Sequence, residues 1–223
     1  MSFTATVTQL TGKANGLSIY PRVITGAAVS QPGTVAGSQS TGASQAITPA
    51  GTGSWVYGAI LGGNTTLTAL AANSPFAAQV TQNSLRYVAL RSISTTTSGT
   101  GITLGASSAT TGLDTSLCEI LVASGQTLAE DGSSPAVSSV SNAQFLATNS
   151  FTGVPAGATL LLIVTSNGGT GTTTVSVTDT SGLGLTWTEH EPINGASKGY
   201  AGTWTARMPA AANLGAFFQG WTP

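Results

Sequence analysis

Residues 186–192 carry the side chains best suited to acid–base or metal chemistry in this chain. His190 is the only histidine, and it lies between Glu189 and Glu191. In an extended strand successive side chains point to opposite faces, so the two glutamates share one face and His190 takes the other. Because a transition-metal site needs three or four ligands around one ion, this segment predicts the solvated polar end of a strand and no metal site.

The other acidic residues do not form a pair whose spacing identifies a hydrolase. A nucleophilic serine needs a base and a group that orients the base, and His190 is the only conventional base. No Gly-x-Ser-x-Gly turn follows a strand in a strand–helix context. We therefore expect no catalytic residue, no cofactor and no metal ion. A glycosidase pair of carboxylates remains as a third hypothesis, drawn from Asp114, Glu119, Glu130, Asp131 and Asp179.

Cys118 is the only cysteine, so the chain forms neither an intramolecular disulfide nor a cysteine-based metal site. It lies in the apolar run 117–121 and is expected to be a small buried hydrophobic side chain. We do not expect a reactive thiol.

Aromatic residues are the candidates for contact with a partner or a glycan. Trp187 and Trp204 lie in alternating segments, which predicts that they pack in the core of a sandwich. The aromatic segment 217–221 is expected to pack on a partner or on the body of the protein. The predicted contact residues, which include two from the loop 194–198, are Trp221, Phe217, Phe218, Asn194 and Lys198.

Charge is scarce throughout the chain. Charged residues make up 6% of the 223 positions, the formal net charge is −1, and 40% of the residues are hydrophobic. That apolar content argues against disorder. No basic run is present, so we expect no nucleic-acid partner. Poorly charged sheet edges are open to pairing with other chains, which predicts that they are covered by identical subunits.

Two features bear on location. Residues 1–4 lack the basic and apolar regions of a signal peptide, so we expect synthesis in a cytoplasm without a secretion signal. The longest apolar runs, such as 160–164, are too short to span a bilayer, so we expect no membrane partner.

Alternating apolar and polar residues, separated by Gly, Pro, Asn and Ser, recur along the whole chain. This pattern predicts an all-β fold, an antiparallel and jelly-roll-like β-sandwich, with a single helical turn near 209–214. Residues 32–42 are expected to form a long surface loop. The expected strands are 3–9, 18–25, 45–47, 54–61, 66–70, 86–94, 102–106, 118–123, 143–148, 159–166, 174–178, 185–191 and 199–208.

One pattern occurs twice in the chain. Pro-Ala-Gly at 49–51 precedes an apolar strand and then Gly-Gly at 62–63, and Pro-Ala-Gly at 155–157 precedes an apolar strand and then Gly-Gly at 168–169. Both matches have the same offset of 106 positions, which indicates a duplication. The chain then forms either two similar halves or one large permuted sandwich. We expect a division into 1–128 and 136–223, with a connection over 129–135.

Three segments resemble the β-sandwich modules of tailed-phage virion proteins. They are Val-Pro-Ala-Gly-Ala-Thr-Leu-Leu-Leu-Ile-Val at 154–164, Val-Ser-Val-Thr-Asp-Thr-Ser-Gly-Leu-Gly-Leu-Thr-Trp-Thr at 175–188 and Gly-Tyr-Ala-Gly-Thr-Trp-Thr-Ala at 199–206. The resemblance is to minor tail proteins of actinobacterial phages and covers residues 143–208. Residues 3–26 resemble strands that follow this pattern in such modules, although here they come first. That order predicts a permutation, a strand exchange between subunits or a break in a larger module.

The resemblance implies a non-enzymatic structural protein of a phage virion, in a tail, a tail tip or a capsid decoration, and brings no catalytic residues with it. The implied partners are copies of the chain, other virion proteins and a host cell-surface glycan. The alternative, from another class, is a carbohydrate-binding, lectin-like module. It predicts exposed Trp or Tyr side chains on a concave sheet face or at a loop tip.

Overall fold

The structure is a computed structural model. It describes residues 2–9, 14–40, 44–62, 67–70, 76–82, 85–107, 113–167, 174–195 and 199–209. Every regular element in these ranges is a β-strand, and the strands pair in an antiparallel manner. The predicted all-β, antiparallel sandwich fold is confirmed.

The described strands between residues 35 and 120 form a first sandwich. Its larger sheet has the strand order β4 (Val35–Ser40), β11 (Leu113–Ile120), β6 (Trp55–Gly62), β9 (Leu85–Arg91) and β8 (Phe76–Gln82). Its smaller sheet has the order β5 (Ser44–Ile47), β10 (Ile102–Ser107) and β7 (Thr68–Ala69). Numbered along this segment, the strands lie as 1-8-3-6-5 and 2-7-4. This is the order of a jelly roll whose fifth strand lies in the larger sheet.

The second sandwich combines both ends of the chain. In its larger sheet, β12 (Ala129–Glu130) and β13 (Ser138–Ala143) both pair with β3 (Ala14–Thr25), which is followed by β16 (Thr159–Asn167), β19 (Gly199–Arg207) and β18 (Thr188–Gly195). The smaller sheet has the order β14 (Phe145–Ala147), β2 (Ala5–Gln9) and β17 (Val175–Asp179). Beside it, β1 (Ser2–Phe3) pairs with β15 (Phe151–Thr152).

Both sandwiches have the same strand order once β2 and β3 are placed after β19. In that order, β2 and β3 correspond to β10 and β11 of the first sandwich. The remaining correspondences, in sequence order, match β4, β5, β6, β7, β8 and β9 with β13, β14, β16, β17, β18 and β19. Within the chain, β3 pairs with β16 over the register from Thr159 opposite Ile24 to Asn167 opposite Gly16. Of the three predicted explanations for the early strands, this arrangement corresponds to the permutation.

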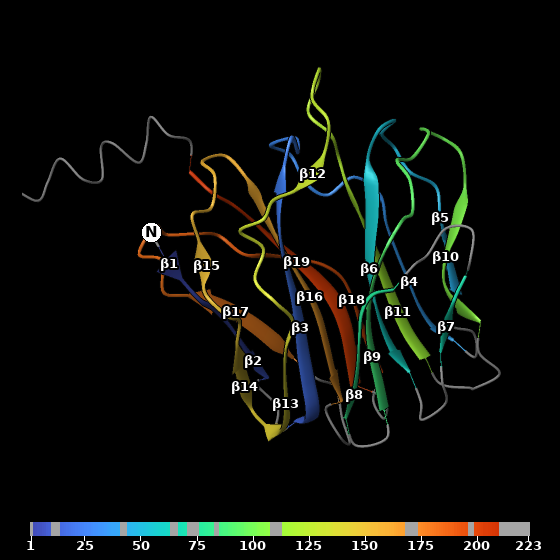
Figure 1. The fold of residues 1–223 in the computed structure, drawn as a ribbon. Helices are drawn as coiled ribbons and strands as arrows, with labels where there is room; N and C mark the ends of the chain where they lie inside the picture. Colours follow the sequence, from blue (N-terminus) through green and yellow to red (C-terminus); the bar gives the residue numbers. More distant parts are fainter. Residues whose placement is uncertain are drawn as a thin grey trace, which may run out of the picture.

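The sheets stack in four layers (Figure 1), and three apolar cores lie between them. One outer core lies between the sheet of β2 and the sheet of β16 and includes Val7, Leu162 and Trp204. The middle core lies between the two larger sheets and includes Tyr57 and Ile163. The other outer core lies between the sheet of β6 and the sheet of β10. The two sandwiches therefore pack back to back.

The repeated sequence pattern corresponds to equivalent strands. With the offset of 106 positions, Tyr57 of β6 corresponds to Ile163 of β16, and both belong to the middle core. Val56 and Leu162 correspond in the same way, and each faces the outer core of its own sandwich. The agreement of faces and strand order supports the predicted duplication.

Some sequence predictions fail at small, polar segments. The loop expected over 32–42 is wrong in its second part, because Val35–Ser40 forms β4 and pairs with β11. β8 was not expected at all. Strands within 2–25 pair with strands within 129–207, so sheet pairing crosses the division expected at 129–135; the domain boundaries themselves stay a prediction. The structure does not describe residues 210–223, so the helical turn expected near 209–214 stays a prediction.

Candidate functional site

Of the predicted contact residues, only Asn194 lies in the described part of the chain. It belongs to β18, is partly buried, and lies opposite Tyr200 of β19. Trp221, Phe217, Phe218 and Lys198 fall outside the described residues, so their contacts stay a prediction. Trp204 is 8% exposed and Trp187 packs against the same core, as expected.

The histidine segment forms the edge strand β18, and His190 points into the protein. It is 6% exposed, and its Nε2 lies 2.7 Å from Oγ1 of Thr205. The Tyr200 hydroxyl donates a hydrogen bond of 2.5 Å to the Glu189 carboxylate. The expected solvated strand end is therefore wrong for His190, because β18 packs against β4 and β11 of the facing sheet. Glu189 and His190 have separate partners on opposite faces.

Acid is expected to destabilise the protein through His190. Burial lowers the pKa of this imidazole below its ordinary value of 6.5, so the unfolded chain binds a proton in a pH range where the folded chain does not. The free energy of unfolding therefore falls as the pH drops below about 6.5. Thermal melts at about pH 7.5 and about pH 5.5 should show a smaller loss of Tm for His190→Gln than for the wild type. An equal loss in both proteins would contradict this.

The acidic residues that the structure describes have different surroundings. Asp179 accepts a hydrogen bond of 3.1 Å from Nε1 of Trp187, and Asp131 accepts one of 2.9 Å from the backbone of Ser133. Asp114 is fully buried in β11. Within the described ranges, no three His, Cys, Asp or Glu residues are grouped so that they could hold a metal ion.

Glu119 is a buried carboxylate that holds two loops of the first sandwich. It is 0% exposed and accepts hydrogen bonds of 2.8 Å each from the backbone N–H groups of Thr34, Ala50 and Gly51. A Cβ atom on Gly51 would collide with Ser54, and one on Gly33 would collide with Glu119 itself. The first Pro-Ala-Gly turn is thus shaped around this side chain.

Glu130 joins the two sandwiches through the connecting strand β12. Its Oε1 accepts hydrogen bonds from Arg91 over 2.9 Å and from the Tyr57 hydroxyl over 3.0 Å, and its Oε2 lies 3.2 Å from Nε of Arg22. The Arg91 guanidinium also stacks on Trp55, 4.7 Å from the ring centre. Burial and the neighbouring Glu130 carboxylate raise the pKa of Tyr57. Arg22 belongs to the second sandwich and Arg91 to the first, so we interpret this cluster as structural.

A pocket of about 130 Å³ opens beside His190, where β18 and β19 approach the connection 26–34. Of the four threonines that line it, three lie on strands: Thr159 and Thr205 are buried, and Thr188 is exposed. Arg207 lies next to them and donates a hydrogen bond of 2.8 Å to Thr159 and one of 3.0 Å to the Ala27 carbonyl. The pocket therefore offers hydroxyl groups and one guanidinium. Its other lining residues are Val29, Gln31, Thr186 and Ala206.

The outer face of the sheet of β2 carries hydroxyl groups in cross-strand rows. Phe145, Thr8 and Ser176 form one row, and Ala147, Thr6 and Thr178 form the next. The inward positions of β2 are buried, whereas Thr6 and Thr8 are partly exposed. Phe145 is 65% exposed. Neither row contains an ionisable side chain.

Cys118 is buried as expected, and burial raises the pKa of its thiol to about 12.

In the described ranges no Trp or Tyr is exposed; the exposed large hydrophobic side chains there are Val29, Ile93, Val137 and Phe145.

Comparison of the chain with protein-family models, with curated proteins and with solved structures gives no match. No helix in the described parts of the chain has the length and apolar character needed to cross a membrane.

Proposed function

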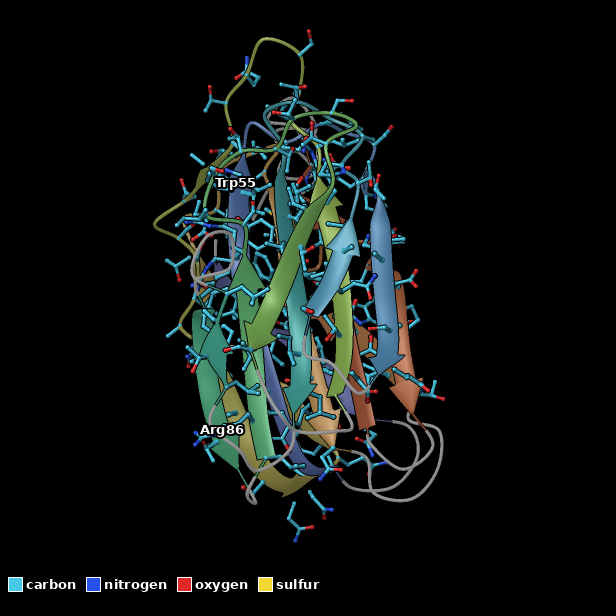
Figure 2. All side chains as sticks on the ribbon, turned by 90° about the vertical axis from the view of Figure 1, so that its right-hand side faces the viewer. Trp55 and Arg86 are labelled. Carbon is cyan, nitrogen blue, oxygen red and sulfur yellow. The ribbon has the colours of Figure 1, made fainter. Side chains whose placement is uncertain are left out.

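We propose that this chain is a non-enzymatic structural protein of a phage virion, of the tail, minor tail or capsid decoration type, which assembles with copies of itself. The observation that carries the proposal is the chemistry of its two outermost faces. One is the face with the hydroxyl rows of β2, β14 and β17. The other, on β5, β10 and β7, exposes Ala46, Thr103, Ser107 and Thr68, and Figure 2 is turned so that this side of the molecule faces the viewer.

Such faces suit contacts between proteins. The centres of protein interfaces are depleted of charged residues, because a charge loses its hydration when it is buried. Hydroxyl groups can instead form hydrogen bonds across the contact. The jelly-roll order is compatible with this role, since jelly rolls occur in viral capsid and lectin domains. The fold alone does not decide between these functions.

Phage particles purified from a culture that produces the chain provide the test. Quantitative mass spectrometry should find the chain in the particles in a fixed ratio to the major capsid protein. If the chain is made in infected cells but is missing from purified particles, the virion proposal is wrong.

The second candidate function is carbohydrate binding, and the threonine-lined pocket is the observation that favours it. Convergent hydroxyl groups and a guanidinium can hydrogen-bond to a sugar unit. A glycan array of cell-wall saccharides should then give a signal that Thr188→Leu weakens about tenfold, which corresponds to roughly 1.4 kcal/mol of binding free energy. Thr178→Leu, on the outer face of β17, is the matched control and should bind like the wild type. An array without any signal would exclude this function.

A further inference from the structure

The two sandwiches have equivalent edge strands that differ in chemistry. β8 follows β9 at the end of one larger sheet, and β18 follows β19 at the end of the other. Both are the fifth strand of their sandwich in the shared order. An edge strand leaves a row of backbone N–H and C=O groups free to pair with another chain unless the sequence prevents it.

β18 carries several features that prevent such pairing. Glu189 and Glu191 are charged, and Pro192 lacks a backbone N–H. The register shifts between His190 and Ile193, and Glu191 has a positive φ of 41°, as expected at a β-bulge. Charges, proline and bulges are the features that natural edge strands use against unwanted pairing.

β8 has none of these charges and no proline. Its sequence is Phe-Ala-Ala-Gln-Val-Thr-Gln, and its register with β9 shifts once, between Phe76 and Ala78, and is regular from Ala78 to Gln82. In the part of the chain that the structure describes, β9 is its only sheet neighbour. Figure 2 labels Arg86 on β9, which lies opposite Thr81 of β8. Among the residues that the structure describes, this edge is therefore open and uncharged, and it is regular from Ala78 to Gln82.

Apolar surface continues from this edge onto the facing sheet. Ala78 and Val80 of β8 are partly buried and line a small cavity together with Val137 and Ile163. Val137 is 37% exposed. A strand placed beside β8 would cover backbone groups and could also cover this valine, so pairing there gains both hydrogen bonds and apolar burial.

We propose that β8 pairs in an antiparallel manner with β8 of a second copy of this chain, which joins the two larger sheets of the first sandwiches across a twofold axis. An edge that meets itself needs a self-complementary sequence, and a strand without charges never places like charges opposite each other. The equivalent pairing of β18 would bring glutamates together. The inference rests on the proposed function and names the edge through which the copies assemble.

Light scattering on the full chain tests this edge. The wild type is expected to have at least twice the chain mass of 22.0 kDa. Val80→Lys places a charge beside the partly buried cavity of this strand, where pairing with a second copy would bury it further, and should reduce the mass to that of a monomer. Thr188→Lys makes the same change at a threonine of the protected strand β18 and should leave the mass unchanged.

A second variant keeps the test valid if Val80→Lys does not fold. Thr81→Lys changes an exposed side chain, so the fold should be retained, while its ammonium group and the guanidinium of Arg86 opposite it place like charges at the paired edges of both copies and oppose dimerisation. A variant that keeps the wild-type mass and circular dichroism overturns the β8 pairing but leaves assembly through other faces intact. A monomeric wild type whose β8 amides resist hydrogen exchange would show that another segment of the same chain covers the edge, which also overturns the pairing.

Discussion

Glu119→Ala is expected to lower the free energy of unfolding by about 3–5 kcal/mol, because three backbone N–H groups lose their acceptor together. The carboxylate is completely buried, and each of its three hydrogen bonds measures 2.8 Å. Residues 33–34 and 50–51 are shaped around it, so water can replace it only if these loops separate. Urea unfolding followed by circular dichroism measures the change.

Glu119→Gln is the matched control. It keeps the size and one acceptor oxygen but points an amide donor toward backbone donors, so its loss should be smaller than that of alanine and still measurable. The second sandwich provides a comparison within the same chain. The residue equivalent to Glu119 is Pro21, because Pro21 lies opposite Leu162 in the same way as Glu119 lies opposite Val56. The free energy of unfolding of Glu119→Ala could instead lie within about 1 kcal/mol of the wild-type value, which is less than the usual cost of one buried donor without an acceptor. That result would show that the three hydrogen bonds do not hold these loops.

Deleting residues 1–29 is expected to prevent folding of the second sandwich. β3 lies between β16 and the pair of β12 and β13, and Leu17, Ile19, Val23 and Ile24 are all 0% exposed. Without β3, the central strand β16 becomes an edge with apolar residues on both faces, which favours aggregation. Solubility and far-ultraviolet circular dichroism of the deletion variant check this result.

A circular permutant separates missing residues from a changed order. In it the chain begins at Ser30 and residues 1–29 follow Pro223, with residues 210–223 as the connection. The new ends fall between Val29 and Ser30, which are both exposed, and such sites tolerate interruption best. The permutant is expected to fold with the circular dichroism spectrum of the wild type, because β2 and β3 then follow β19 as β10 and β11 follow β9. A soluble, folded deletion variant, or an unfolded permutant, would contradict the shared strand order.

The sequence was informative where strands are apolar or rich in β-branched and aromatic residues. The strands expected at 159–166 and 199–208 are present within about one residue of the observed ends, which is the usual uncertainty of strand boundaries. β4 and β8 were missed, and both contain Gly or Ala, which are depleted in strands. β4 pairs with β11 and β8 pairs with β9, and the residues of β4 and β8 alone do not indicate these partners.

Of the candidate site residues, the buried polar groups were the least predictable. Glu119 was treated as one of several scattered carboxylates, although it is the only charged residue in the apolar run 117–121. A lone charge in such a run is a signal for a buried acceptor with several donors. The burial of His190 depends on the facing sheet, because β4 and β11 cover β18, and that contact is not visible in the sequence. The threonine pocket likewise combines residues from four separate segments.

The central claim is that this charge-poor double sandwich assembles with copies of itself. The most direct measurement is the native mass of the full chain by light scattering coupled to size exclusion, over about a hundredfold range of concentration, since assembly depends on mass action. The account predicts a mass at least twice the chain mass of 22.0 kDa at the upper concentrations. A folded chain that has the mass of a monomer over the whole range would contradict it.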